Sequence, residues 1–251
     1  MDVTAYLSRI GAKRDDDLPT LMARQLEAVP FENLSVHLRE PITTEPEALL
    51  EKIVDRRRGG FCYELNGAFA LLLDALGYDV TRWSARVSRG DGTFGPPGDH
   101  MALVVPDGGR RLLVDVGFGR FAQGPLDLDR RDDQADRFGT FALRDAPDGE
   151  LDAVHDGAVV YRLDPRARLR DDFAPPCWWH ATSPISPFTA SLLCSRVTPT
   201  GRLTLAGDLF ITTGDDGART ERTLTVDEQL AAYRDDFGFV LERVPEALHP
   251  R

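Results

Sequence analysis

Apolar side chains recur three and four positions apart through residues 1 to about 83, the spacing that lays one hydrophobic stripe along a helix. The positions with this spacing outside the last helix are Tyr6, Leu7, Ile10, Leu18, Leu21, Met22, Leu26, Leu49, Leu50, Ile53 and Val54. The longest stripe comprises Phe61, Leu65, Ala68, Phe69, Leu72, Leu73 and Leu76, and Gly77 follows it as a C-terminal cap. These patterns predict an N-terminal helical domain, residues 1–83.

From about residue 84 the hydrophobic period changes to two, which is typical of strands. Strands are predicted at residues 84–88, 100–105, 111–116, 140–143, 159–163 and 177–181, with a glycine- and proline-rich loop at 90–98. Acidic loops such as 127–136 separate these short strands. The pattern predicts a small antiparallel barrel or sandwich over residues 84–185.

A third portion, residues 186–251, combines strands with one helix. The strands are expected at residues 191–197, 203–205, 209–213 and 223–225. Thr225 and Glu228 have the spacing of a capping box, and the helix that they open should end near Gly238. The whole chain is therefore of the α+β class.

Pro30 interrupts the helical pattern, because proline restricts the preceding residue to extended conformations. Glu32 then lies in a loop beside apolar residues. We interpret it as the partner of an arginine such as Arg9 or Arg58 rather than as a catalytic group.

The net charge is −11 and the isoelectric point is near 4.9, so the overall field repels nucleic acid and anionic membranes. An anionic small ligand would need a local arginine cluster or a helix start. No apolar run of the 251 residues is long enough to span a bilayer, and no signal core follows the first charges. Three cysteines make an odd count that argues for reduced thiols, so we expect a cytoplasmic protein.

Cys62 is the first candidate for chemistry, because it stands directly at the predicted start of a helix after two glycines. Unpaired amide groups and the helix dipole at that position should stabilise a thiolate and lower its pKa. Gly59 and Gly60 should allow a sharp turn and leave the space above the sulfur free. A buried cysteine that only fills the core is the competing interpretation.

The second candidate is a hairpin whose strands carry His100 and Asp115. With a two- or four-residue loop, Ala102 faces Asp115 and His100 projects from the same face one diagonal step away, at roughly 7–8 Å. A three-residue loop would reverse the faces. Cys62, His100 and Asp115 supply the nucleophile, base and orienting carboxylate of a cysteine-protease-like constellation.

The remaining histidines are weaker candidates. His37 is expected in a loop, His155 and His249 in polar surface stretches, and His180 in a packed strand beside two tryptophans. The spacing from Cys177 to His180 lacks a second ligand pair, so no metal site is expected. No phosphate-binding glycine loop or dinucleotide motif is present either.

With these motifs the chain resembles the arylamine N-acetyltransferase family. Blocks in family order lie at residues 6–11, 29–34, 58–66, 100–104, 113–119 and 186–189, and together they span about residues 5 to 200. The most specific is Arg-Gly-Gly-Phe-Cys at residues 58–62.

The resemblance implies a helical domain, a β-barrel and an α/β lid, with Cys62, His100 and Asp115 between the first two. It implies ping-pong transfer of an acetyl group from acetyl-CoA to an arylamine, hydrazine or arylhydroxylamine. Cys62 would be acetylated, His100 would act as base and later as acid, and Asp115 would orient the imidazole. The positions that match the family's acceptor pocket are Phe31, Val87, Phe118 and Phe188.

Three alternatives stay open. An amide synthase that releases a polyketide chain from a carrier-protein thioester would use the same three residues. A cysteine hydrolase such as a peptidase or a transglutaminase-like protein would need no coenzyme A. A non-catalytic binding protein is disfavoured, because all three chemical groups are intact.

Overall fold

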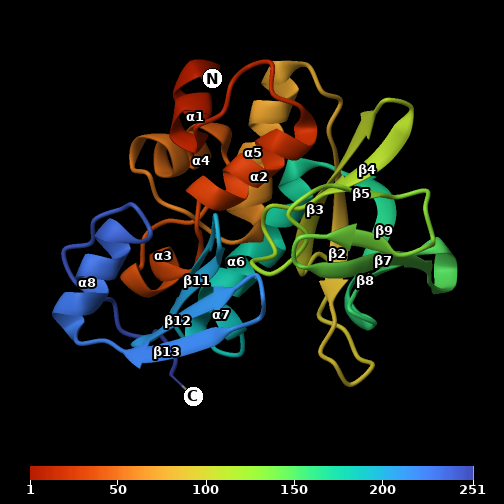
Figure 1. Ribbon diagram of the computed structural model, residues 1–251. Coiled ribbons are helices and arrows are strands. Elements are labelled where there is room, and N and C mark those ends of the chain that lie inside the picture. The colour runs from red at the N-terminus through yellow and green to blue at the C-terminus, as the bar shows by residue number, and fades with distance from the viewer. Residues whose placement is uncertain (251) are drawn as a thin grey trace.

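The structure is a computed structural model that describes residues 1–250 (Figure 1). Its first part contains α1 (Val3–Ile10), α2 (Leu18–Ala28), α3 (Leu34–Leu38), α4 (Pro46–Leu50), a π-helical turn η1 (Glu51–Asp55) and α5 (Cys62–Leu76). The side chains of Asp2 and Asp17 cap α1 and α2, while Gly11 and Gly77 end α1 and α5 in the left-handed conformation. The predicted helical stripes are thus confirmed.

An eight-stranded antiparallel sheet follows, in the order β5-β4-β3-β2-β9-β8-β7-β6. Its strands are β2 (Thr81–Val87), β3 (His100–Asp107), β4 (Arg110–Val114), β5 (Leu126–Asp127), β6 (Gln134–Asp136), β7 (Gly139–Asp145), β8 (Leu151–His155) and β9 (Ala158–Arg168). The side chain of Gln134 donates to the Asp127 carbonyl at 3.0 Å and accepts from the Asp127 amide at 2.8 Å. These bonds join the two edge strands, so the sheet is a nearly closed barrel rather than a sandwich.

The last part contains a second sheet, in the order β1-β10-β11-β12-β13. It is built from β1 (Phe31–Glu32), β10 (Leu193–Thr198), β11 (Gly201–Ala206), β12 (Leu209–Gly214) and β13 (Arg219–Thr223), and α8 (Val226–Asp235) packs beside it. The capping box at Thr225 is present, as predicted. Short 3-10 turns at η2 (Pro147–Gly149) and η3 (Arg170–Phe173), and the helices α6 (Ala174–Thr182) and α7 (Pro187–Ala190), complete the chain.

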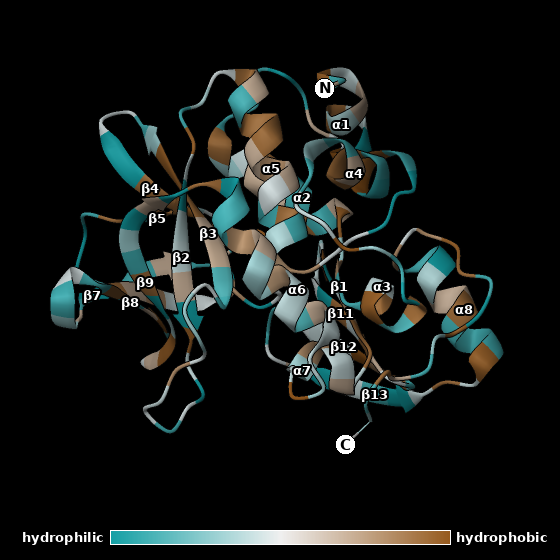
Figure 2. Cartoon of the chain, turned by 180° about the vertical axis from the view of Figure 1, so that it is seen from behind, coloured by the Kyte–Doolittle hydropathy of each residue, from teal (hydrophilic) through white to brown (hydrophobic). Residues whose placement is uncertain are grey.

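Strand β3 separates the two largest hydrophobic cores. Met101, Leu103 and Val105 pack in the core around α5, whereas Ala102 and Val104 pack in the barrel core. Alternate side chains of a strand point to opposite faces, so one strand serves both cores. Figure 2 shows the apolar residues along α5, which lies between the N-terminal helices and the barrel.

Four sequence predictions were wrong. Glu32 lies in strand β1, not in a loop, because it pairs with Cys194 of β10. Residues 177–181 form part of helix α6, not a strand, because Pro175 and Pro176 stand in its first turn, where proline favours helix initiation. His37 lies in α3, not in a loop. Thr225 caps α8, so the strand expected at 223–225 ends at Thr223.

The division into three domains at residues 83 and 185 stays a prediction. Two features cross those positions: β1 of the first part pairs with β10 of the last, and Phe173 and Cys177 belong to the core around α5.

Candidate active site

Cys62 is the first residue of α5 and is only 3% exposed. The chain enters the segment that leads to this helix through Arg57, which adopts the left-handed conformation with φ of 55°. Gly59 and Gly60 are not at positive φ. A Cβ on Gly59 would lie 1.8 Å from the Pro30 carbonyl oxygen, and one on Gly60 would lie 2.5 Å from the Glu64 carboxylate. The two glycines therefore permit close packing beneath the nucleophile, which corrects the expectation that they make the turn.

Buried ion pairs support this segment. Arg58 contacts Glu32 at 2.9 Å, which confirms the structural interpretation of Glu32, and Lys52 contacts Glu64 at 2.6 Å. Burial alone would raise the pKa of Glu32, but the charges of Arg58 and Lys52 outweigh it, so its pKa lies below the ordinary value. The carboxylate is thus held ionised inside the fold.

His100 and Asp115 meet as the hairpin predicts. Leu103 pairs with Val114, and a two-residue loop of Gly108 and Gly109 connects the strands, so Ala102 stands opposite Asp115. His100 Nε2 lies 2.7 Å from Asp115 Oδ2, and both side chains are buried. The second carboxylate oxygen of Asp115 accepts from the Gly117 amide at 3.0 Å.

Asn66, one turn after Cys62, ties α5 to both strands of this hairpin. Its side-chain amide donates to the Met101 carbonyl at 2.6 Å and to Asp115 Oδ1 at 2.9 Å, while its oxygen accepts from the Val116 amide at 2.9 Å. Sequence reasoning gave Asn66 no role. A signal was available, because Asn66 is a polar residue four positions after Cys62 and therefore on the same helix face.

The Met101 backbone also acts on the Cys62 thiol. Met101 directly follows His100 in β3, and its carbonyl accepts from Asn66, four residues after Cys62 in α5. Burial raises the pKa of this thiol well above its ordinary value, although the bond from Met101 works in the opposite direction. The expected lowering of the pKa by the helix start is therefore wrong for the thiol taken by itself. The desolvation of a buried sulfur outweighs the contribution of a few amide groups.

Aromatic rings surround the imidazole and the nucleophile. The His100 ring lies 5.2 Å edge-on from Phe118 and 5.1 Å from Tyr161. Phe188 stacks at 5.2 Å on Phe61, the residue before Cys62, and lies 6.2 Å from Phe31.

Val87 is the fourth predicted pocket residue. It pairs across strands with Tyr161, so its side chain shares a face with the ring that packs on His100. Phe118 thus contacts the His100 ring directly, whereas Val87, Phe188 and Phe31 are linked to the site through Tyr161 and Phe61. Their role as an acceptor pocket stays a prediction.

The other cysteines and histidines do not contact the Asp115 carboxylate in any hydrogen bond of the described residues. Cys177 and Cys194 are buried free thiols. His155 is half-buried and bonds to the Phe138 carbonyl at 2.7 Å, whereas His180 is buried against Asp99. Among residues 1–250, no cluster of three or more His, Cys, Asp or Glu side chains could hold a metal ion.

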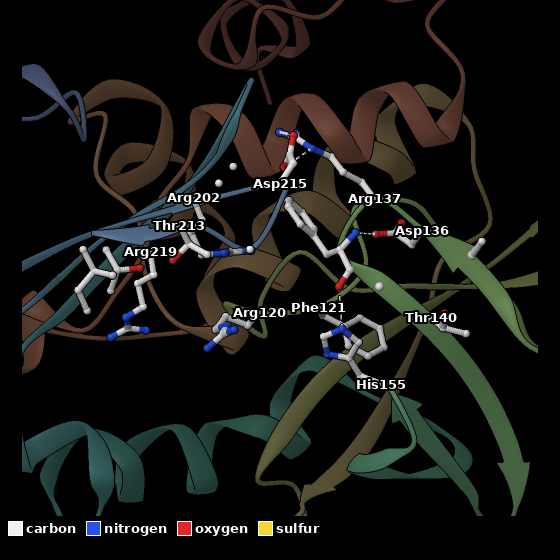
Figure 3. Close-up of a pocket in the computed structure, with 18 of the residues that line it drawn as sticks. Arg120, Phe121, Asp136, Arg137, Thr140, His155, Arg202, Thr213, Asp215 and Arg219 are labelled. Carbon is white, nitrogen blue, oxygen red and sulfur yellow. Dashed lines mark hydrogen bonds and ion pairs between the residues drawn. The ribbon is translucent and has the colours of Figure 1, made fainter. Parts of the chain in front are cut away.

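A cavity of about 760 Å³ lies between the barrel and the second sheet. Figure 3 shows Arg120, Arg202 and Arg219 gathered on one side of it, across from Phe121 and His155. Within the described part of the chain, neither Arg120 nor Arg202 has a carboxylate partner. Burial lowers the pKa of Arg202 to about 10, and the nearby charge of Arg120 adds to this effect. An anion would relieve this repulsion.

No helix within residues 1–250 is long and apolar enough to cross a membrane. The cavity, the two unpaired arginines and the buried Cys-His-Asp arrangement can be compared with known proteins.

A family described as N-acetyltransferase matches residues 16–245. An arylamine N-acetyltransferase of Mycolicibacterium smegmatis is 37% identical over 221 residues, which cover 82% of this chain and 80% of the relative. A human protein named arylamine N-acetyltransferase 1 is 32% identical over 236 residues, which cover 82% of this chain and 81% of the relative.

Solved structures agree. The M. smegmatis arylamine N-acetyltransferase superposes with a TM-score of 0.88 at 34% identity over 99% of both chains. The Mycobacterium marinum enzyme in complex with CoA superposes with a TM-score of 0.85 at 31% identity, over 95% of this chain and 93% of that one. The matched sequence and the shared fold lead to one conclusion: the chain belongs to the arylamine N-acetyltransferase family.

Proposed function

We propose that this chain transfers an acetyl group from acetyl-CoA to an aromatic amine, hydrazine or arylhydroxylamine, in two steps through acetylated Cys62. The observation that supports the residue roles is the buried bond between His100 and Asp115, together with Asn66, which joins the first turns of α5 to Met101 and Asp115. The roles of Cys62, His100 and Asp115 are carried over from the family and supported by this geometry.

In the first step the Cys62 sulfur attacks the acetyl carbonyl while His100 takes the thiol proton. The C–S bond to coenzyme A breaks, and the proton passes from His100 to the departing sulfur. In the second step the amine nitrogen attacks the Cys62 thioester, His100 takes a proton from that nitrogen, and Cys62 leaves and is reprotonated. Asp115 holds the imidazole in one tautomer and stabilises its charged form.

The pKa of the thiol supports general-base action. Because burial raises the pKa of Cys62, the sulfur needs a neighbour that takes its proton. We assign this role to the imidazole of His100, which is hydrogen-bonded to the Asp115 carboxylate.

The acceptor is proposed to bind against Phe31, Val87, Phe118 and Phe188. Phe188 and Phe31 form a wall next to the nucleophile, and Phe118 stands edge-on to His100. Such rings suit a planar aromatic amine, because offset or edge-on contacts add to the burial of apolar area.

The phosphates of coenzyme A are proposed to bind at Arg120 and Arg202. These arginines line the cavity without carboxylate partners, in a protein of net charge −11. Phe121, in the same cavity, lies 6.1 Å from the Phe118 ring, which contacts His100. The proposal requires the acetyl end of the donor to extend from this cavity past Phe121 and Phe118 to Cys62.

We place the reaction in the cytoplasm, where a reducing milieu keeps a thiol nucleophile free. The alternative of an amide synthase acting on a carrier-protein thioester is not supported, because the relatives described above carry the name arylamine N-acetyltransferase.

Intact-protein mass spectrometry tests the proposal. Incubation with acetyl-CoA should add one acetyl group, and an aromatic amine should then remove it. Cys62→Ala should give no adduct and stay folded, whereas Cys177→Ala and Cys194→Ala should behave as the parent. An adduct of equal yield in Cys62→Ala would disprove the nucleophile.

The arginine assignment has its own test. Arg120→Gln with Arg202→Gln should raise KM for acetyl-CoA roughly tenfold, because two charged hydrogen-bonding groups are lost. KM for acetyl-pantetheine, which lacks the nucleotide phosphates, should not change. Arg222→Gln, whose partner Glu228 lies outside the cavity, is the control. An equal rise for both donors would contradict the assignment.

A further inference from the structure

A second buried histidine–carboxylate pair stands one residue before His100, and the proposed chemistry does not use it. Asp99 Oδ1 lies 2.8 Å from His180 Nε2. Asp99 is 9% exposed and His180 is 3% exposed. Two such groups are seldom buried without a function or a structural requirement.

Three consecutive residues that lead into β3 are each anchored to a different element. The Gly98 carbonyl accepts from the Tyr63 hydroxyl at 2.7 Å, and Tyr63 is the residue after Cys62. Asp99 is bound by His180 on α6, and His100 is bound by Asp115 at the end of β4. The backbone that leads to His100 is therefore anchored at two successive residues, in addition to the bond that His100 makes with Asp115.

His180 also reaches the wall beside the nucleophile. The Ser186 hydroxyl donates to the His180 carbonyl at 2.9 Å and accepts from the Phe188 amide at 3.2 Å. The His180 ring meets the Phe188 ring edge-on at 5.1 Å, and Phe188 stacks on Phe61. One histidine thus contacts both the segment that leads to His100 and the proposed acceptor wall.

Asp99 serves two donors at once. Its Oδ1 faces His180, and its Oδ2 accepts from the Val87 amide at 3.2 Å. A Cβ on Gly95 would lie 1.8 Å from Oδ2, so the loop before β3 closes directly over the carboxylate. A carboxylate can accept from both groups, whereas an asparagine that kept the bond from Val87 would turn its NH2 toward His180 and require the other imidazole tautomer.

We propose that Asp99 and His180 form a positioning pair for acyl transfer, which sets His100 and Phe188 relative to Cys62. The inference rests on the proposed role of His100 as the base. Neither residue of the pair touches the reacting atoms. Their effect on the rate comes from the placement of groups that do, and small misplacements of such groups cost up to about a hundredfold in rate.

The test compares His180→Leu with His180→Gln, in which the amide can still donate to Asp99. The readouts are the single-turnover rate of Cys62 acetylation per folded molecule and KM for an aromatic amine. His180→Leu should slow acetylation roughly ten- to a hundredfold and raise this KM. His180→Gln should stay within about threefold of the parent. A folded His180→Leu with the parent rate and KM would overturn the proposal.

His37→Leu is the matched control. His37 is 5% exposed and has two hydrogen bonds, to the Ser191 carbonyl at 3.1 Å and from the Leu248 amide at 3.0 Å, but it does not contact the segment before His100. The His37→Leu variant should have a lower thermal unfolding midpoint than the parent but the same rate of Cys62 acetylation per folded molecule. If His37→Leu slowed acetylation as much as His180→Leu does, the loss would reflect general destabilisation of the fold, and the proposal would be overturned.

A milder variant keeps the test valid if His180→Leu does not fold. Ser186→Ala removes only the oxygen between His180 and Phe188. It should raise KM for the amine and leave Cys62 acetylation unchanged, whereas an unchanged KM would overturn the link to Phe188. Failure of the parent itself to form acetyl-Cys62 would instead contradict the proposed function.

Discussion

The carboxylate of Asp115 accepts three hydrogen bonds, from His100, Asn66 and the Gly117 amide. Asp115→Asn would place an NH2 group against at least one of these donors and remove the charge that steadies imidazolium. We expect acetylation of Cys62 to slow on the order of 10³-fold or more. Stability should fall by about 1–3 kcal/mol.

Thermal unfolding and single-turnover acetylation, measured on the same sample, separate the two effects of Asp115→Asn. Asn66→Ala is a useful comparison, because it removes a donor and leaves the charge. A folded Asp115→Asn that acetylates at the parent rate would reduce Asp115 to a structural carboxylate.

The ionisation of Cys62 is the second property at the residue scale. Burial raises the pKa of the thiol taken alone, and a neighbouring imidazolium favours the thiolate. The titration therefore belongs to Cys62 and His100 together. The rate of alkylation by iodoacetamide should rise at a pH about 1–3 units lower in the parent than in His100→Gln.

In that variant the imidazolium is gone and burial outweighs the opposing effect of the Met101 backbone, so its midpoint should exceed the roughly 8.5 of a free cysteine. Circular dichroism of both proteins provides the folding control. Coincident alkylation profiles would mean that His100 does not charge-pair with the nucleophile.

At the scale of elements, the contact between α5 and the loop after β4 depends on Gly117. A Cβ there would lie 2.7 Å from Cys62 Cα and 2.7 Å from Asn66 Nδ2. The Cys62 Cα belongs to the helix backbone and cannot move aside as a flexible side chain can, so Gly117→Ala should push the loop away from the helix. We expect a loss of about 1–3 kcal/mol in stability and at least roughly tenfold in acyl transfer.

Gly124→Ala is the control, since its Cβ would meet only Asp136 at an ordinary 3.8 Å. The test measures the free energy of unfolding in denaturant and the rate of Cys62 acetylation for Gly117→Ala and Gly124→Ala. Equal behaviour of both alanine variants would show that the close approach at Gly117 is not needed.

At the scale of the whole molecule, Arg58 joins the segment before α5 to the C-terminal part. It pairs with Glu32 on β1 and stacks over the Phe239 ring at 5.1 Å. Arg58→Met would leave a buried carboxylate with much less compensation, which typically costs about 3–5 kcal/mol. Urea unfolding should show this loss at neutral pH.

The dependence on pH gives a second readout. The pKa of Glu32 is lowered in the fold, so its contribution to stability is present above the unfolded pKa and is lost as pH falls below about 4.5 toward the folded value. In Arg58→Met burial dominates, and this acid-induced loss should shrink or reverse. An unchanged acid profile would contradict the assignment of Glu32 to this pair.

Short-range signals determined much of this protein. Helix caps, the three-four stripe after Cys62 and the hairpin around Gly108 depend on neighbours in the chain, so they could be predicted. The meeting of His100 and Asp115 followed for a two- or four-residue loop, and the structure has the two-residue one. An arginine partner for Glu32 could be predicted because a buried carboxylate requires a cation, and the structure selects Arg58 rather than Arg9.

Tertiary structure decided the rest. In the segment at residues 177–181 the tryptophans favour a strand and the prolines at the start of α6 favour a helix, and packing of Cys177 in the core around α5 supports the helix. The same holds for Phe31 and Glu32, which become a strand only because β10 lies beside them. The pKa of Cys62 depends on burial by several elements, and the charge of the cavity depends on Arg120 and Arg202 meeting across two sheets. Desolvation and long-range charge are sums over spatial neighbours, so only the folded arrangement determines them.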